Sequence, residues 1–413
     1  MRFRWAVLLV ALTAACGTAL PDAGVPAAGV ATPIPSLAAT SALTPTPSPT
    51  PSSSSTPSPS ATPSQSPGRA GEGAVTVLAL PGYAEWGGND KRVNWVVPFE
   101  NKSGCKVTVR ELATDPVADP VADPAADPAA RLDDVLGPYD VVSAPPDLAG
   151  LIVAAKGAAV VDTARIPTYD AIPKRLRPRF PDGETYAVPF LWSTDTVLYE
   201  GAKGDIYHSD GPVLYRNSPL TIGAAALTLE GVRDPFQLTP EQFADAVALV
   251  GRDGQHREFW RDPIEVVQGF ATGSARFAQA PPYVMDLLNR AGRKVKAVAQ
   301  RPVTGRVDSW VMAADAPHPR CAYAWMAYAS TAEVQRQVAA WTGLAPANPG
   351  ACAKEAARRV CDDYGVNDLK GISFASLPAK DCGPGSGGKP ESGKPEDCVD
   401  YAEWVGAWRQ ITG

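Results

Sequence analysis

The chain has 413 residues, 45% of them hydrophobic and 20% charged, which is enough for two or three ordinary domains with buried cores. Its formal net charge of −6 argues against a nucleic-acid-binding protein, because such proteins usually carry a basic face. The 42 prolines are spread unevenly, which indicates a division between Pro-rich and folded segments.

The first 16 residues have the pattern of a secretory signal. Arg2 and Arg4 precede a short apolar run that ends in small residues before Cys16. The run is too short for a lasting transmembrane helix, and its end, LTAAC, resembles the lipobox of bacterial lipoproteins. We therefore expect a signal peptide over 1–16 and lipid on Cys16, which anchors the protein to the cell membrane on its extracytoplasmic face. Simple cleavage beside an unmodified cysteine is the alternative.

Residues 17–74 form a segment rich in Pro, Ser, Thr and Ala, including TPTPSPTPSSSSTPSPS. The segment has no hydrophobic period, and its few large apolar side chains cannot offset the entropy cost of ordering. Pro-rich segments are extended. We therefore expect a disordered N-terminal tether between the lipid anchor and a folded body.

The folded body is expected to begin with a buried strand, AVTVLAL, at residues 74–80. A helix near 92–101 and a second strand at 105–112 follow. Residues 115–130 then repeat Asp-Pro every four residues, and proline at that spacing excludes a regular helix or a central strand. We interpret the repeat as a low-complexity insertion. A calcium-binding repeat is the alternative, although the glycines and alternating ligands of such loops are missing.

Strand-like and helix-like segments alternate after the insertion, at 139–146, 148–159, 185–200, 239–252, 307–314 and 321–343. The segment at 239–252 starts with Thr-Pro-Glu-Gln, a pattern typical of a helix N-terminus. Alternation of this kind predicts an α/β fold with a largely parallel sheet.

Six cysteines remain besides Cys16, namely Cys105, Cys321, Cys352, Cys361, Cys382 and Cys398. An even number in an exported chain indicates disulfides, and fifteen pairings are possible in principle. Short separations favour Cys352–Cys361 and Cys382–Cys398, which leaves Cys105 with Cys321.

The sequence carries no recognisable catalytic or metal-binding pattern. Its three histidines, His208, His256 and His318, lie far apart and away from any cysteine pair with zinc-site spacing. No nucleophile elbow of the type G-x-S-x-G occurs. The run GPGSGGKP at 383–390 lacks the Ser or Thr that follows the Lys of a phosphate-binding loop. We therefore expect neither an enzyme nor a metal or cofactor site.

Aromatic and acidic side chains follow or occupy several expected strands, namely Tyr83, Glu85, Trp86, Asp147, Trp192, Asp195, Asp308 and Trp310. Ligands of open α/β sheets bind at the carboxyl ends of strands. Aromatic walls with acidic ends suit a ligand that has an apolar body and amine groups. Each aromatic taken singly also fits core packing.

Several stretches occur in an order that is specific at family level: GYAEWGG, WVVPFENKSGCKVTV, YDVVSAP, YAVPFLWSTDTVLY, WTGLAPANPGAC and DCVDYAEWVGAW. On these stretches, residues 74–413 resemble actinobacterial extracellular solute-binding lipoproteins of the spermidine/putrescine-type ABC importer class. The resemblance implies an α/β, two-lobed type II periplasmic binding protein-like fold whose lobes close over a ligand. It implies one lobe over 75–188 and 309–345 and a second lobe over 189–308 and 346–413.

The same resemblance implies a set of ligand-binding residues. Tyr83 and Trp86 match an aromatic pair after the first strand, and Asp147 falls in a pocket loop after the third. Trp192 lies on the long strand-like stretch. Asp308 matches a carboxylate that holds a ligand amine on a strand crossing between the lobes.

Two positions depart from the polyamine-binding pattern. Arg306 stands where an aromatic is expected, and a pocket tryptophan is missing near Gln279. A cation about 4 Å from a ligand ammonium costs roughly 4 kcal/mol at an effective dielectric near 20. That cost offsets one or two charge-assisted hydrogen bonds. The other options are that Arg306 pairs with Asp308 or faces solvent.

We therefore expect a monomeric substrate-binding lipoprotein that captures a polyamine or related amine and passes it to ABC transporter permease subunits. The first alternative is the same fold with another ligand, such as an amino acid, a small peptide or a carboxylate that Arg306 grips. The second alternative is a surface lipoprotein that serves as a sensor or interaction module.

The lipid anchor is directly testable. We expect Cys16→Ser to release the protein from membranes, because the variant lacks the thiol that carries the lipid. The measurement is the distribution of wild type and variant between membrane and soluble fractions after a high-salt wash. A variant that stays in the membrane fraction contradicts the prediction.

Overall fold

The structure is a computed structural model, and it describes residues 72–88, 90–112, 132, 136–252, 256–298, 302–381 and 397–413. The expected signal peptide, the lipidation site Cys16, the insertion at 115–130 and Cys382 lie outside the described residues, as does the tether up to residue 71. The predictions for these segments therefore stay predictions. Among the described helices, none combines the length and the apolar content that a membrane span requires.

Seven strands form the first sheet, in the order β11-β4-β10-β3-β1-β2 with β12 beside β10. Their bounds are β1 Ala74–Ala79, β2 Lys106–Glu111, β3 Val141–Ala144, β4 Ala187–Thr194, β10 Val303–Met312, β11 Ala345–Pro346 and β12 Ile372–Phe374. Strand β1 pairs in parallel with both β2 and β3, so that Val77 lies opposite Val109 on one side and Val141 on the other. The β-branched run that predicts the first strand is thus a central strand, buried between two neighbours.

Five strands form the second sheet, in the order β7-β6-β8-β5-β9. Their bounds are β5 Thr196–Glu200, β6 Val213–Arg216, β7 Arg257–Trp260, β8 Phe277–Ala280 and β9 Val295–Ala297. Strand β6 runs parallel to β7 and β8, and β5 runs antiparallel to β8 and β9. The carboxyl ends of β6, β7 and β8 therefore lie along one edge of the sheet.

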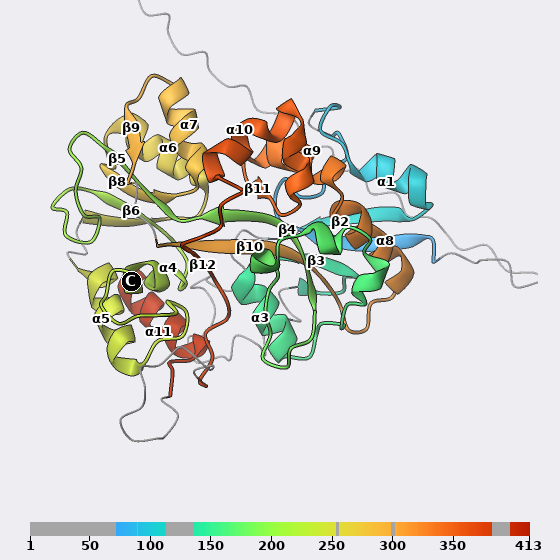
Figure 1. The fold of residues 1–413 in the computed structure, drawn as a ribbon, viewed down its shortest axis with the longest axis horizontal. Coiled ribbons are helices and arrows are strands. Elements are labelled where there is room, and N and C mark those ends of the chain that lie inside the picture. The colour runs from blue at the N-terminus through green and yellow to red at the C-terminus, as the bar shows by residue number, and fades with distance from the viewer. Residues whose placement is uncertain are drawn as a thin grey trace, which may run out of the picture. The chain divides into compact units, whose positions relative to one another are not determined.

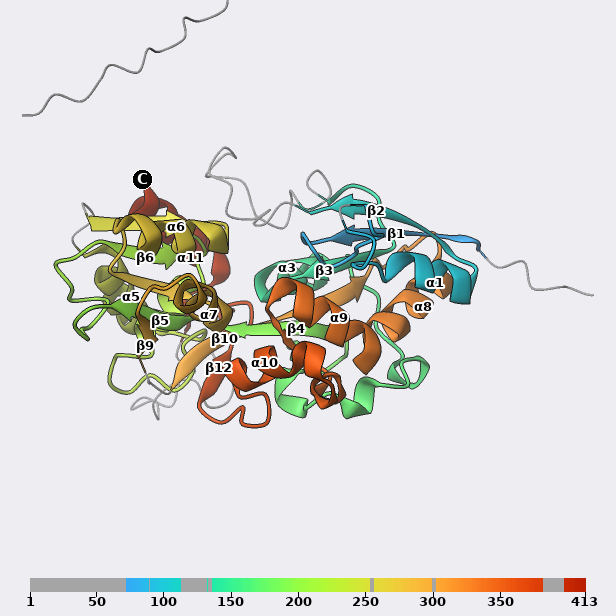
Figure 2. The same ribbon diagram turned by 90° about the horizontal axis from the view of Figure 1, so that it is seen from above.

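Two chain segments connect the sheets. Only Asp195 separates β4, in the first sheet, from β5, in the second. Strand β10 pairs antiparallel with β4, and the register shifts between Asp308 and Ser309. Figure 1 and Figure 2 show β4 and β10 running from the first lobe toward the second. The two α/β lobes joined by crossing strands confirm the predicted two-lobed fold.

Ten helices among the described residues surround the two sheets: α1 Val96–Ser103, α3 Pro146–Ala154, α4 Thr221–Ala226, α5 Pro240–Gly251, α6 Pro263–Thr272, α7 Pro282–Arg290, α8 Pro319–Ala329, α9 Ala332–Thr342, α10 Glu355–Tyr364 and α11 Tyr401–Thr412. Helix α5 begins as its sequence predicts. The Thr239 hydroxyl accepts the backbone N–H of Gln242, and the Gln242 side chain accepts that of Thr239, which satisfies two N–H groups at the helix start.

Helix α1 begins later than expected. The prediction placed a helix near 92–101, whereas the structure has it over Val96–Ser103. The cause is local, because the backbone N–H groups of Trp95 and Val96 both donate to the carbonyl oxygen of Glu85. The preceding residues therefore follow the loop after β1 instead of forming a helical turn.

The division between the lobes also differs from the expected boundaries. Residues 346–413 were assigned to the second lobe, but β11 pairs with β4 and β12 pairs with β10, both in the first sheet. Helix α10 packs on α9 and β11, so it too belongs mainly to the first lobe. Helix α11, by contrast, packs on α5 beside the second sheet.

Two of the expected disulfides are present among the described residues. Cys105, just before β2, is bonded to Cys321 in α8, and Cys352 is bonded to Cys361 in α10. Cys398 is also disulfide-bonded. Its predicted partner, Cys382, lies outside the described residues. The pairing inferred by elimination for Cys105 and Cys321 is thereby confirmed.

The two bridges should differ in their effect on stability, because they close loops of very different length. The sequence separations are 216 residues for Cys105–Cys321 and 9 for Cys352–Cys361. Chain entropy predicts that the longer loop stabilises by about 2–3 kcal/mol more than the shorter one. Urea unfolding of the Cys105→Ala/Cys321→Ala and Cys352→Ala/Cys361→Ala variants measures the two losses. Equal losses would contradict a mainly entropic role.

Candidate functional site

Tyr83 and Asp308 meet where strands of the first lobe end. Tyr83 follows β1, and Asp308 lies on β10 near the register shift. The Tyr83 hydroxyl donates a hydrogen bond of 2.5 Å to Oδ2 of Asp308, and both side chains are buried. Burial, reinforced by the negative charge of Asp308, raises the pKa of Tyr83 well above its usual value. Tyr83 therefore remains a donor that holds the carboxylate in place.

Arg306 lies two residues before Asp308 on β10, and three acidic side chains act on its charge. Its Nε is 4.0 Å from Oδ1 of Asp308, which makes an ion pair but not a hydrogen bond. Burial by itself lowers the pKa of Arg306, but the charges of Asp308, Asp195 and Asp147 outweigh burial and raise it. Arg306 therefore stays charged, and it pairs with Asp308 instead of pointing into solvent.

Asp147 connects the first lobe to the C-terminal helix. It lies at the start of α3, and its Oδ2 accepts a hydrogen bond of 2.9 Å from the hydroxyl of Tyr401 in α11. Burial raises the pKa of Asp147, against the opposing effects of the Tyr401 hydroxyl, the backbone N–H of Leu148 and Arg306. The sequence analysis did not select Tyr401, whose only signal is its position in the DCVDYAEWVGAW stretch.

Asp195, between β4 and β5, and Arg216, on β6, extend this group of polar side chains to the second lobe. We call the whole group the interlobe cluster. Asp195 Oδ2 accepts a hydrogen bond of 3.2 Å from Thr304, and Oδ1 lies 3.9 Å from Nη1 of Arg216. Burial raises the pKa of Asp195. Arg216 is the last residue of β6, and its guanidinium lies 5.3 Å from the centre of the Trp260 ring. Asp195 is one of the acidic residues noted in the sequence, but neither it nor Arg216 is among the expected ligand-binding residues.

Several polar atoms of these side chains, and one of Gln279 on β8, are buried without a hydrogen-bond partner among the described residues: Asp195 Oδ1, Arg216 Nη1, Arg306 Nε, Asp308 Oδ1 and Gln279 Oε1. Most buried polar groups in proteins are hydrogen-bonded, so a group of unpaired ones requires an explanation. These atoms come from both lobes and include donors and acceptors. The arrangement is suited to a small polar ligand bound where the lobes meet.

Two of the expected site residues are not brought into this cluster. Trp192 is buried in the core of the first lobe, where its ring contacts those of Tyr364 and Phe374 and its N–H donates to the carbonyl oxygen of Pro346. Trp86 is 55% exposed, and its described backbone pairing is with Asn94, in its own loop. Core packing therefore explains Trp192, and the cluster does not depend on Trp86.

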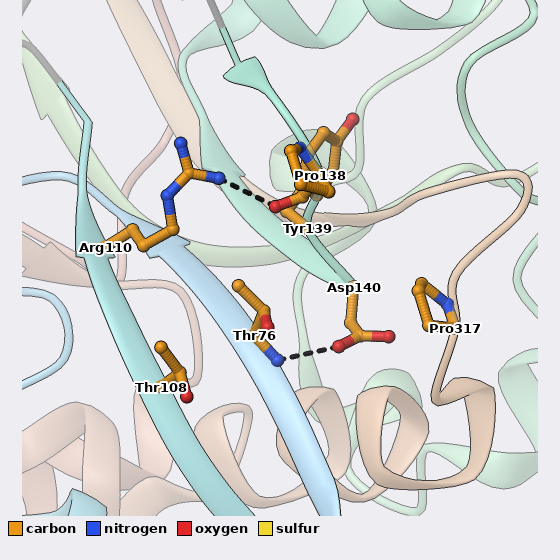
Figure 3. A pocket seen from close by; sticks show the side chains of 7 residues that line it. All are labelled: Thr76, Thr108, Arg110, Pro138, Tyr139, Asp140 and Pro317. Carbon is orange, nitrogen blue, oxygen red and sulfur yellow. Dashed lines mark hydrogen bonds between the residues drawn. The ribbon is translucent and has the colours of Figure 1, made fainter. Parts of the chain in front are cut away.

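A separate pocket of about 300 Å³ is lined by residues of β1, of β2 and of the segment that leads into β3. Figure 3 shows that Asp140 there accepts the backbone N–H of Thr76, at 2.7 Å, and that Arg110 donates to the carbonyl oxygen of Pro138. Asp140 also accepts the backbone N–H of His318, at 2.6 Å. The charged side chains of this pocket therefore serve to hold the local fold together, unlike those of the interlobe cluster.

Ionisation of Asp147 should destabilise the protein when no ligand is bound. A raised carboxyl pKa means that the cost is absent below about pH 3.9, grows as the pH rises from there to the raised value and is constant above it, at about 1.4 kcal/mol per pKa unit. We expect Asp147→Asn to raise the melting temperature at neutral pH and to lose this advantage near pH 4. Asp182→Asn is the control of opposite sign, because the Tyr186 hydroxyl lowers the pKa of Asp182. An Asp147→Asn variant that is less stable at neutral pH contradicts the prediction.

Comparison with known proteins is consistent with this geometry. Residues 200–359 match the family model described as "Bacterial extracellular solute-binding protein". The PBP MotA from A. tumefaciens B6, solved in complex with glucopine, superimposes with a TM-score of 0.57 at 15% identity, over 82% of this chain and 100% of that chain.

Two further solved structures have the same fold. A putative spermidine/putrescine ABC transporter protein from Listeria monocytogenes gives a TM-score of 0.58 at 11% identity, over 82% of this chain and 98% of that chain. The TpPotD lipoprotein of Treponema pallidum gives 0.57 at 15% identity, over 73% and 94%. The chain therefore has the two-lobed fold of periplasmic binding proteins, and over residues 200–359 it is similar to bacterial extracellular solute-binding proteins.

Proposed function

We propose that this protein is the substrate-binding lipoprotein of an ABC importer and that it captures a small amine-bearing solute between its two lobes. The observation that carries the proposal is the set of buried, unpaired polar atoms that both lobes direct to their junction. The proposed binding residues are Tyr83, Asp147, Asp195, Arg216, Arg306 and Asp308. Trp192 is withdrawn from the set expected from the sequence, because its side chain packs in the core.

The position of these residues in the sheets supports ligand binding. Tyr83 and Asp147 follow β1 and β3, and Arg216 ends β6. In open α/β sheets the carboxyl ends of parallel strands are where ligands bind. Here the strand ends of two sheets contribute to one cluster, as expected when two lobes close over a solute.

The charge of the cluster supports an amine as part of the ligand. Three aspartates, Asp147, Asp195 and Asp308, share two guanidinium groups, which leaves one negative charge in excess. Burial raises the pKa of Asp147 and of Asp195. Their negatively charged forms are therefore disfavoured unless a further positive charge lies nearby. A ligand ammonium supplies this compensation, and each charge-assisted hydrogen bond contributes about 1.5–3 kcal/mol.

The connections between the lobes suit capture followed by release. The β4–β5 crossing and β10 are two of the covalent links around which hinge closure would occur. Away from them, Arg359 in α10 forms an ion pair with Asp286 in α7, across the lobes. We propose that the lipid on Cys16 keeps the monomeric protein beside its permease subunits, on the extracytoplasmic face of the cell membrane.

Asp308 provides the sharpest test of the proposal. Its unpaired Oδ1 is available to a ligand ammonium, so Asp308→Asn should weaken binding by about tenfold or more, equivalent to 1.4 kcal/mol. The measurement is calorimetry with putrescine, spermidine and a panel of amino acids. Asp140→Asn is the matched control, because Asp140 is equally buried in the first lobe but lies before β3, outside the cluster.

Two results would contradict the proposed function. The first is that neither the panel nor small molecules extracted from the protein's own cell envelope bind to the wild type. The second is that Asp308→Asn binds as tightly as the wild type and Asp140→Asn. Either result would favour the alternative of a surface lipoprotein without a transport role.

A further inference from the structure

We infer that Arg216 binds a carboxylate of the ligand while Asp195 and Asp308 bind its amine, so that the protein selects amino-acid-like zwitterions over the corresponding simple amines. The inference rests on the proposed function and names the ligand class of the same site. It departs from the polyamine that the sequence resemblance favours.

The unpaired atoms of the cluster include both hydrogen-bond donors and hydrogen-bond acceptors. Oδ1 of Asp195 and Oδ1 of Asp308 are acceptors, whereas Nη1 of Arg216 and Nε of Arg306 are donors. A polyamine offers only N–H donors, so it would satisfy the carboxylates and leave the guanidinium groups unpaired. A buried charged group without a partner is costly. A ligand with an ammonium and a carboxylate satisfies both kinds of atom.

Both ion pairs of the cluster are too long for hydrogen bonds. Arg216 and Asp195 are separated by 3.9 Å, and Arg306 and Asp308 by 4.0 Å. All four facing atoms are buried and unpaired among the described residues. Each pair therefore presents one donor and one acceptor to a bound group, instead of using them on each other.

Arg216 is better placed than Arg306 to bind a ligand carboxylate. The charge of Arg306 is already opposed by Asp308, Asp195 and Asp147. Among the described side chains, Arg216 forms an ion pair with Asp195. A guanidinium group binds carboxylates through two parallel N–H donors, and its position over the Trp260 ring orients that fork.

The second lobe provides a further buried polar atom on the strand next to β6. Gln279 lies on β8, which pairs in parallel with β6, and its backbone oxygen accepts the N–H of Trp260 at 2.8 Å. The Gln279 amide nitrogen donates to the hydroxyl of Tyr207 at 3.0 Å, which leaves Oε1 as a fixed, buried acceptor. Gln279 stands near the position where the polyamine pattern has a tryptophan, so an aromatic wall is replaced by a hydrogen-bonding group.

Ligand pairs that differ by one carboxylate test the inference directly. The probes are ornithine with putrescine, arginine with agmatine, and 4-aminobutyrate with butylamine, measured by calorimetry on the full chain. In at least one pair the wild type should bind the acid about tenfold or more tightly than the amine. Arg216→Gln should weaken the acid by about tenfold and change the amine by less than about twofold.

Three controls accompany this measurement. Arg216→Lys keeps the charge without the two-donor fork, so it should retain part of the preference for the acid. Arg293→Gln removes another positive charge of the second lobe, one that pairs with Glu200, and should leave the preference unchanged. Circular dichroism establishes that each variant is folded, and the preference of the wild type tests the inference even if Arg216→Gln does not fold.

The outcomes separate this inference from the proposed function. Tighter binding of the amine in every pair, or equal weakening of acid and amine by Arg216→Gln, would overturn the zwitterion and leave a binding protein for amines. Absence of binding to the wild type by all six probes and by envelope extracts would overturn both.

Discussion

The site depends on the attraction between the guanidinium of Arg306, a partly buried residue on a strand that crosses between the lobes, and the three aspartates around it. Asp147, Asp195 and Asp308 would repel one another if no cation opposed their charges. Arg306 opposes these charges without balancing all of them, and its Nε makes no hydrogen bond to the described residues. Some hydrogen-bonding atoms of the cluster are therefore left for a ligand, although Arg306 balances part of the negative charge.

This arrangement costs stability that the rest of the fold must offset. Unpaired buried polar atoms are unfavourable, and those of Asp195, Arg216, Arg306 and Asp308 are among the ones found in the described residues. The first lobe compensates with a dense aromatic core, in which Trp310 and Trp325 pack edge to face 5.6 Å apart, and with the bridge between Cys105 and Cys321. Raised carboxyl pKa values are typical of functional sites. At such sites, groups that favour ligand binding often lower the stability of the free protein.

Local pattern was sufficient to predict much of the fold and part of the site. The strand at Ala74–Ala79, the start of α5 at Thr239 and the bridge between Cys352 and Cys361 all depend on nearby residues. The position of Trp192 could not be predicted, because both faces of β4 are buried and alternation cannot tell which face meets a ligand. Arg216 was missed because its role depends on the order of strands in the second sheet, which no local pattern contains.

The central claim is that a small molecule binds between the lobes through the buried cluster. Native mass spectrometry of the protein purified from its own cell envelope tests this most directly, with wild type and Asp308→Asn compared under identical conditions. The account predicts a bound small molecule on the wild type, containing both an amine and a carboxylate, and little or none on the variant. A wild type free of any small molecule, or one that carries the same ligand to the same extent as Asp308→Asn, would contradict it.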